Sequence, residues 1–157
     1  MLARATLINL IFAISIPPCL AAPSDQPSSK ATPDKTKPLT SAVFDWTKLA
    51  VIPTKTGERC DILNAPTPTL ARLESHVTTL QPGEAPHPAH THPDEEIVIV
   101  KEGHLAATIG DRVEKVGPGS MIFFAANEPH GVSNAGETPV TYFVIRILAH
   151  GTTGTTR

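Results

Sequence analysis

Short segments rich in β-branched residues, separated by glycine and proline, run through this chain from about residue 50 to residue 148. Many short strands at such a spacing are typical of a β-sandwich or barrel. One segment, Leu70–Leu80, also fits a helical period, but Val77 and its threonines favour a strand. The predicted strands are Ala50–Ile52, Arg59–Leu63, Leu70–Leu80, Ile97–Val100, Leu105–Ile109, Ser120–Ala125 and Pro139–Leu148.

The N-terminus has the order of a secretory signal peptide. Met1–Arg4 carries one positive charge, Leu7–Ile16 is an almost unbroken apolar run, and small residues follow at Cys19–Ala22. The apolar run is too short to span a bilayer comfortably. We therefore predict that residues 1–21 are removed near Ala21, leaving a periplasmic or secreted protein without stable membrane insertion. The alternative is an uncleaved N-terminal anchor, while prolines before Cys19 argue against a lipoprotein.

Composition divides the remaining chain. Residues 22–40 are rich in Pro, Ser, Thr and Lys, with Leu39 as the one large apolar residue, so they predict a flexible linker. The folded domain is expected over 41–150, followed by a disordered tail at 151–157. A formal net charge of −2 leaves no basic excess, which argues against a nucleic-acid partner. Cys60, alone after signal cleavage, is expected to be a small packed residue.

Histidine is concentrated in one part of the chain, with six of the seven inside a 55-residue stretch. His90 and His92 are two apart, so on a strand their side chains leave the same face. One extended strand would put Glu96 on the order of 13 Å beyond His92. A turn at Pro93–Asp94 would bring that carboxylate back beside the imidazoles. Two neutral imidazoles and a carboxylate on a rigid sheet suit a first-row divalent metal.

A second pattern occupies residues 117–134, where an apolar strand leads into a turn that presents His130 as a fourth candidate ligand. The two patterns together resemble the two motifs of the cupin superfamily. The matching residues are Gly83, His90, His92, Glu96 and Gly103 in the first motif, and Gly119, His130 and Asn134 in the second.

The match departs from the family pattern at three points. One extra residue follows Gly83, Ala125 stands where the family usually has proline, and Asn127 stands where it usually has glycine. Asparagine tolerates the left-handed conformation better than most residues, so the turn at Asn127 is expected to be kept.

The resemblance implies an all-β, single-domain fold, an antiparallel β-barrel also described as a double-stranded β-helix or jelly roll. It also implies that His90, His92, Glu96 and His130 hold one divalent transition metal, with Mn, Fe, Ni and Zn as candidates. The leading hypothesis is a metal-dependent enzyme, dioxygenase- or decarboxylase-like or an isomerase, acting on a small oxygenated metabolite. The alternative is a non-enzymatic cupin that binds a sugar or metabolite. The sequence assigns no catalytic acid or base.

Other polar residues have weaker assignments. His87 is expected at the barrel mouth, and Tyr142 and Arg146 share one face of a strand; all three are candidates for substrate binding. The opposite face of that strand is more apolar, and we expect it to pack against a second copy in a homodimer. The remaining expectations are that Asp94 and Glu95 are turn and surface acids, and that His76 and His104 are solvated or packed histidines.

Overall fold

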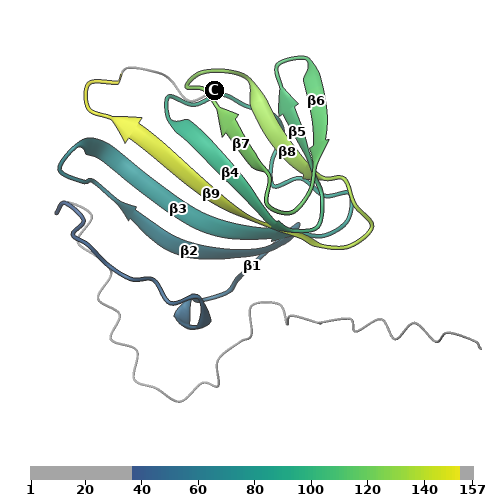
Figure 1. Cartoon of the computed structure of the whole chain (residues 1–157), viewed down its shortest axis with the longest axis horizontal. Helices are drawn as coiled ribbons and strands as arrows, with labels where there is room; N and C mark the ends of the chain where they lie inside the picture. Colours follow the sequence, from purple (N-terminus) through teal and green to yellow (C-terminus); the bar gives the residue numbers. More distant parts are fainter. Residues whose placement is uncertain (1–36, 153–157) are drawn as a thin grey trace, which may run out of the picture.

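The computed structural model describes residues 37–152, which form nine antiparallel strands and one short 3-10 helix, η1 (Trp46–Lys48) (Figure 1). The all-β prediction is therefore confirmed. The predicted signal peptide, most of the predicted linker and the end of the predicted tail lie outside the described residues. The strands are β1 (Ile52–Thr54), β2 (Gly57–Ala65), β3 (Leu70–Leu80), β4 (Glu95–Glu102), β5 (Leu105–Ile109), β6 (Arg112–Val116), β7 (Met121–Phe124), β8 (His130–Asn134) and β9 (Val140–Ala149).

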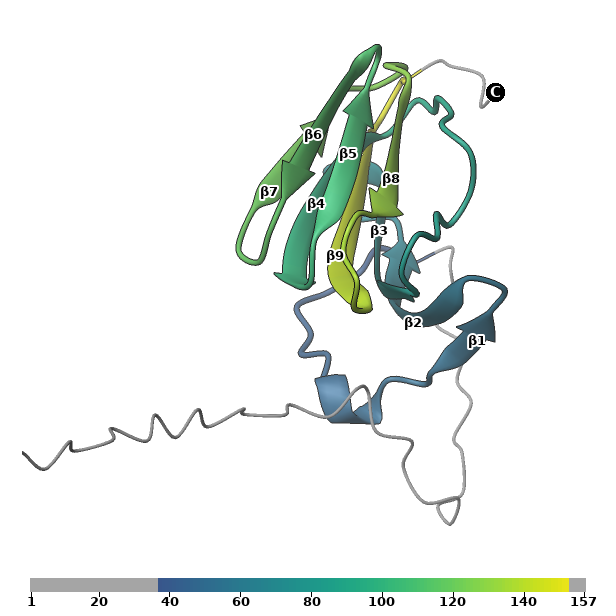
Figure 2. The same ribbon diagram turned by 90° about the vertical axis from the view of Figure 1, so that its right-hand side faces the viewer.

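Two sheets form the body of the domain, with strand orders β1-β2-β3-β9-β4-β7 and β6-β5-β8. Figure 2 shows the smaller sheet packed over the β4 and β9 part of the larger one. Side chains alternate between faces, so on β7 Ile122 and Phe124 are buried while Met121 and Phe123 are exposed. The buried core cluster consists of Leu80, Val98, Val100, Leu105, Ala107, Ile122, Phe124, Val140, Tyr142 and Val144.

Six of the seven predicted strands are present, and Leu70–Leu80 is a strand at the predicted bounds. The seventh prediction, Ala50–Ile52, is displaced, because β1 runs over Ile52–Thr54 and shares only Ile52 with it. The sequence pattern does not predict β6 or β8. Four of the five residues of β6 are exposed, so it has no apolar alternation. Residues 130–134, HGVSN, are mostly weak strand formers, and β8 is defined by its antiparallel pairing with β5. Both strands therefore depend on a partner rather than on their own composition.

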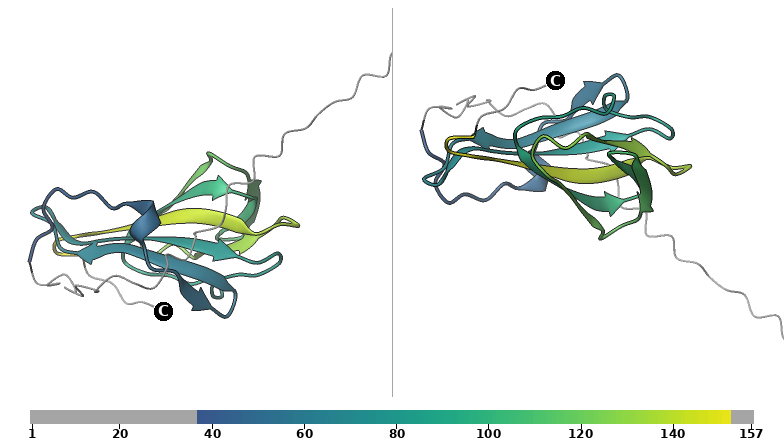
Figure 3. Two further views of the ribbon diagram at one scale, coloured as in Figure 1. Left: turned by 90° about the horizontal axis from the view of Figure 1, so that it is seen from below. Right: turned by 90° about the horizontal axis from the view of Figure 1, so that it is seen from above.

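The segment before β1 runs along the outer face of the larger sheet. Its Leu39 amide donates to the Pro66 carbonyl at 2.7 Å. The Trp46 ring packs 5.7 Å from Phe143, and the Lys101 ammonium lies 4.4 Å from the Trp46 ring centre. Figure 3 (left) shows η1 lying across β9. Cys60, opposite Val77 in the β2–β3 ladder, is buried as predicted.

Two turns require a left-handed backbone. Gly103 has φ +79°, and a Cβ atom there would lie 2.7 Å from the Pro139 carbonyl oxygen. Asn127 has φ +63° and is the one non-glycine residue with positive φ in residues 37–152. The turn expected at Asn127 is thus kept, because asparagine tolerates this conformation. No helix in the described part of the chain is long and apolar enough to cross a membrane.

Candidate metal centre

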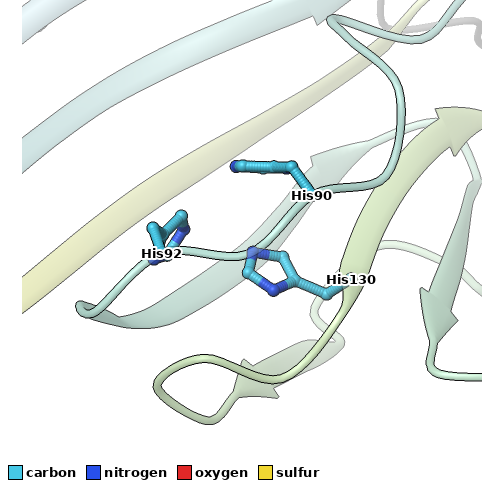
Figure 4. Close-up of side chains that lie close together, drawn as sticks. All are labelled: His90, His92 and His130. Atoms are coloured by element: carbon cyan, nitrogen blue, oxygen red, sulfur yellow. The ribbon is translucent and has the colours of Figure 1, made fainter. Parts of the chain in front are cut away.

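Three imidazoles from two parts of the chain meet between the sheets (Figure 4). His90 and His92 come from the connection that leads into β4, and His130 is the first residue of β8. Their ring centres are 4.7 to 5.1 Å apart, and each offers a ligand atom within 4.8 Å of the others. Such a cluster can hold a metal ion.

Backbone pairing places two of these residues side by side. His90 and His130 form an isolated antiparallel bridge, with reciprocal N–H···O bonds of 2.9 and 3.0 Å. The His92 carbonyl accepts from the Asn127 amide at 2.8 Å. Neither His90 nor His92 belongs to a regular strand, so the shared strand face expected from their spacing is replaced by this loop pairing.

Hydrogen bonds select the ring nitrogen that faces the cluster. His92 Nδ1 lies 3.0 Å from the Asp94 carbonyl, and His130 Nδ1 lies 2.7 Å from the Glu128 carbonyl. A carbonyl only accepts, so each Nδ1 carries the hydrogen and each Nε2 keeps a lone pair. His130 Nε2 and His90 Nδ1 are buried without a hydrogen-bond partner among the described residues. Unsatisfied buried lone pairs on clustered imidazoles fit a divalent metal.

Glu96 on β4 lies beside this cluster. Its Oε2 is 3.1 Å from His92 Nε2, and Arg146 Nε is 3.9 Å from the same oxygen. Two ligands at adjacent octahedral positions, each about 2.1 Å from an ion, are about 3.0 Å apart. The carboxylate therefore stands at a distance from His92 that suits two ligands of one ion.

The protonation states also suit a metal. Burial, reinforced by the neighbouring His87 and His130, lowers the pKa of His90 to about 4. Burial also lowers the pKa of His130. For Glu96, burial opposes ionisation, but its contacts with the His92 and His130 imidazoles and with Arg146 outweigh it and lower the pKa. At neutral pH the cluster thus offers neutral His90 and His130 and an ionised carboxylate, as metal binding requires.

Asp94 corrects one prediction, because it is fully buried rather than a surface acid. Arg72 and Arg146, on two different strands, each donate to one of its oxygens at 2.5 Å. Burial opposes ionisation of Asp94, yet these two guanidinium groups lower its pKa. Two ion pairs with partly buried arginines compensate the lost hydration of Asp94, which is why its charged side chain can lie inside. Glu95, by contrast, is exposed as predicted.

A cavity of about 430 Å³ opens beside the three histidines. His92 itself is fully buried and does not line it. Tyr142, Val144 and Arg146 do, so this face of β9 points inward. The lining side chains include His87, His90, Glu96 and His130 and, from β2 and β3 of the larger sheet, Arg59, Glu74, His76 and Thr78.

The candidate substrate-binding residues occupy different places around the cavity. Tyr142 is almost fully buried, and burial raises its pKa. His87 is exposed, with its ring 4.3 Å from that of His90. Arg146 faces the cavity, but its guanidinium also contacts the carboxylates of Asp94, Glu74 and Glu96. His104 is expected from the sequence to be either solvated or packed, and it is exposed.

Sequence reasoning did not identify the polar wall formed by Arg59, Glu74, His76 and Thr78. Glu74, His76 and Thr78 alternate along β3, so they share one face. That period-two pattern is visible in the sequence. Its polar character suggests a solvent-exposed face, whereas the structure turns it inward.

Comparisons with known proteins agree with this architecture. Residues 76–146 match the sequence model of the Cupin domain family. No curated protein sequence matches the chain.

Three solved structures illustrate the similarity in fold. An RmlC-like cupin from Shewanella frigidimarina is 15% identical, with TM-score 0.57, covering 71% of this chain and 95% of its own. A predicted oxalate decarboxylase from Thermotoga maritima is 16% identical, with TM-score 0.57, covering 68% and 99%. A polyketide cyclase from Streptomyces resistomycificus is 22% identical, with TM-score 0.55, covering 69% and 80%. At these identities the similarity establishes the fold alone.

Proposed function

Because this chain belongs to the cupin superfamily, we propose that it is a metal-dependent enzyme acting on a small oxygenated metabolite. The observation that carries the proposal is the pair of fixed imidazoles, His92 and His130, beside Glu96 and an open cavity. A dioxygenase- or decarboxylase-like reaction is the class we favour, and the oxalate decarboxylase similarity in fold supports it only as an analogy.

The proposed ligands of one divalent transition metal are His90, His92, His130 and Glu96. Manganese, iron, nickel and zinc all accept imidazole, and an oxygen ligand suits the harder ions among them. A bound ion of this kind would supply Lewis-acid or redox chemistry to a small ligand in the cavity. Arg146 is proposed to hold the Glu96 carboxylate in place, since its guanidinium already contacts three acids.

Charge in the cavity indicates the class of ligand. The four charged side chains that line it balance, with Arg59 and Arg146 positive and Glu74 and Glu96 negative. His90 and His130 add no charge at neutral pH because their pKa values are lowered. A divalent ion would leave the cavity with two excess positive charges, so we propose an anionic, oxygen-rich ligand such as a small carboxylic acid.

We also propose that the protein functions in the periplasm or outside the cell, because residues 1–22 have the pattern of a secretory signal peptide. These residues lie outside the described part of the chain. The compartment matters to the metal, because availability rather than affinity alone determines which ion a site receives.

The proposal is tested by metal analysis of protein purified from its native compartment, followed by turnover assays with oxalate, 2-oxo acids, flavonols and sugars. Iron or manganese with oxygen consumption or carbon dioxide release would support the favoured reactions. Zinc would favour isomerase or hydrolase chemistry. Bound metal and ligand without turnover would instead indicate the alternative, a non-enzymatic binding cupin.

A matched pair of variants assigns the result to this site. His130→Ala should lose both metal and turnover, whereas His104→Ala, at an exposed histidine outside the cavity, should keep both. Wild-type protein that binds no divalent transition metal at micromolar concentration would overturn the proposal.

A further inference from the structure

A second pair of titratable side chains, His76 and Glu74, lies on the cavity wall contributed by β3. We propose that these two residues form a proton-transfer pair that acts on a ligand held at the candidate metal centre. The inference rests on the proposed function, and it supplies the acid–base group that the sequence motifs lack.

The two side chains are close and largely buried. His76 Nδ1 lies 3.3 Å from Glu74 Oε1, and the side chains are only 10% and 11% exposed. Nδ1 itself is inaccessible to solvent, and its contact with Glu74 is an ion-pair distance without hydrogen-bond geometry, while the residue lines the cavity. The ring edge left to face a ligand therefore carries Nε2. A base oriented by an adjacent carboxylate is a recurring arrangement in acid–base catalysis.

Glu74 is held ionised by its surroundings. Arg59 Nη2 is 3.0 Å from Oε1, and Arg146 Nη1 is 3.5 Å from Oε2. Contact with His76, opposed by burial and assisted by Arg59, lowers the pKa of Glu74 to about 2. Glu74 therefore stays an anion at neutral pH, with its carboxylate next to the His76 ring.

This polar wall is unusual for its position. Farther along the same strand Leu80 belongs to the apolar core, together with Val98 and Val140 of the neighbouring strands. Buried polar groups are costly unless they are paired, and in clefts they mark candidate functional sites. An ion-pair network that only stabilises the fold would also keep these buried groups paired. The test must therefore distinguish a structural role of His76 and Glu74 from a role in proton transfer.

Strand register places the pair within reach of the metal centre. Glu74 is opposite Arg146 on β9, and Arg146 is opposite Glu96 on β4. Two strand spacings put the Glu74 and Glu96 backbones about 10 Å apart. Their side chains meet over one cavity of about 430 Å³, so a small ligand beside Glu96 also lies near His76.

The chemical step needs no co-reactant. His76 Nε2 takes a proton from an acidic C–H or O–H of the ligand, and the bonding electron pair stays on that carbon or oxygen. The proton resides on the imidazolium beside Glu74 and then returns to the same or an adjacent atom. The pair thus suits proton exchange or isomerisation of a small oxo or hydroxy acid.

The test follows exchange of the C3 protons of pyruvate with D₂O by ¹H NMR, using the zinc-loaded full chain. General-base catalysis contributes about 10²- to 10⁴-fold, so His76→Gln should lower the exchange rate at least tenfold. His104→Gln, at an exposed histidine outside the cavity, is the matched control and should exchange like wild type. Glu74→Gln should slow exchange and change its pH profile, which loss of a structural contact alone would not do.

An independent readout does not require turnover. Nitrogen-15 NMR of the metal-free protein should show His76 with hydrogen on Nδ1 and a bare Nε2. Equal exchange rates in wild type and His76→Gln, or hydrogen on Nε2 instead, would overturn the inference. Zinc titration distinguishes this outcome from failure of the proposed function, because wild type and His76→Gln should bind zinc equally.

Discussion

His92 and His130 each present Nε2 in a fixed tautomer, whereas His90 Nδ1 has no hydrogen-bond partner among residues 37–152. His90 is instead held by its backbone bridge to His130 and by ring contacts with its neighbours. The ring of His130 also stacks on Phe124, with centroids 4.4 Å apart. Rigid packing at His92 and His130 makes them the most informative ligands to remove.

We predict that His92→Ala and His130→Ala each lower divalent-metal affinity by more than about 100-fold, because loss of a supporting group alone costs about 10- to 100-fold. His87→Ala, at an exposed ring near the mouth, should keep most of the affinity. Competition with a chromophoric chelator measures the difference. Loss of metal in His87→Ala but not in His130→Ala would show that His130 is wrongly assigned.

Glu96→Gln should keep the fold and weaken metal binding, because the amide carries no charge to offset that of the ion. The side chain keeps its size and an oxygen near His92, so thermal unfolding should change little. Isothermal titration with Mn²⁺ and Zn²⁺ tests this expectation. Unchanged affinity for both ions would remove Glu96 from the ligand set.

The ionisation of Glu74 should make the free energy of unfolding depend on pH in the acid range. Its folded-state pKa of about 2 is below the ordinary value of 4.5, so its contribution is complete above about pH 4.5. That contribution is lost as the pH falls toward 2. The difference in unfolding free energy between wild type and Glu74→Gln should therefore be largest near pH 7 and shrink between pH 4.5 and 2.5. Urea unfolding at several pH values measures it, and a constant difference would contradict the prediction.

At the level of strands, Asp94 joins elements that the sequence keeps apart. It precedes β4, and its side chain binds Arg72 of β3 and Arg146 of β9. Its backbone carbonyl accepts from His92 Nδ1, so the same residue ties the sheet to one candidate ligand. Residues on the inward face of β3 thus contact two parts of the site. Arg72 binds Asp94, and Glu74 and His76 line the cavity.

We predict that Asp94→Asn destabilises the fold by about 3 kcal/mol, because Arg72 loses the carboxylate it binds while Arg146 keeps only its longer contacts with Glu74 and Glu96. It should also lower metal affinity by about 10- to 100-fold through displacement of His92. Urea unfolding and chelator competition measure the two effects. Glu95→Gln, at the exposed neighbouring acid, is the control and should change neither. Normal metal affinity in a destabilised Asp94→Asn would confine its role to folding.

Over the whole molecule, the outer face of the larger sheet leaves apolar side chains accessible. Met121 and Phe123 on the edge strand β7 are 67% and 52% exposed. Phe143, expected to pack against a second copy, is partly covered by Trp46 of the same chain. The β7 end of this face therefore stays exposed and could contact a second copy. Edge strands with unpaired backbone groups favour pairing with a strand of another chain.

The predicted homodimer should form through this face. Phe123→Glu should shift the protein to a monomer at micromolar concentration, because a charge would be buried in the contact. Val113→Glu, at an apolar site on β6 that is 65% exposed, should leave the dimer intact. Light scattering measures both, and a wild-type monomer would contradict the prediction.

Export is predicted to remove about 21 residues. Mass spectrometry of protein from the native host should find a mature start near Ala22. Protein that keeps Met1 or Leu2 in the cytoplasm would exclude the periplasmic or secreted location, and full-length protein in the membrane fraction would indicate an uncleaved anchor.

The sequence by itself determined most of the strands and three of the residues that meet, His90, His92 and His130. Those signals are local, because side-chain alternation and motif spacing act over a few residues. It could not decide which faces of β3 and β9 point inward, since polar alternation looks the same whether it meets water or a cavity.

Only the tertiary structure buried Asp94, through arginines 22 and 52 residues away. It also joined His90 to His130 and placed Glu74 and His76 over the same cavity. These outcomes depend on strand register and long-range ion pairs. Their free energy arises only when distant segments exclude water together.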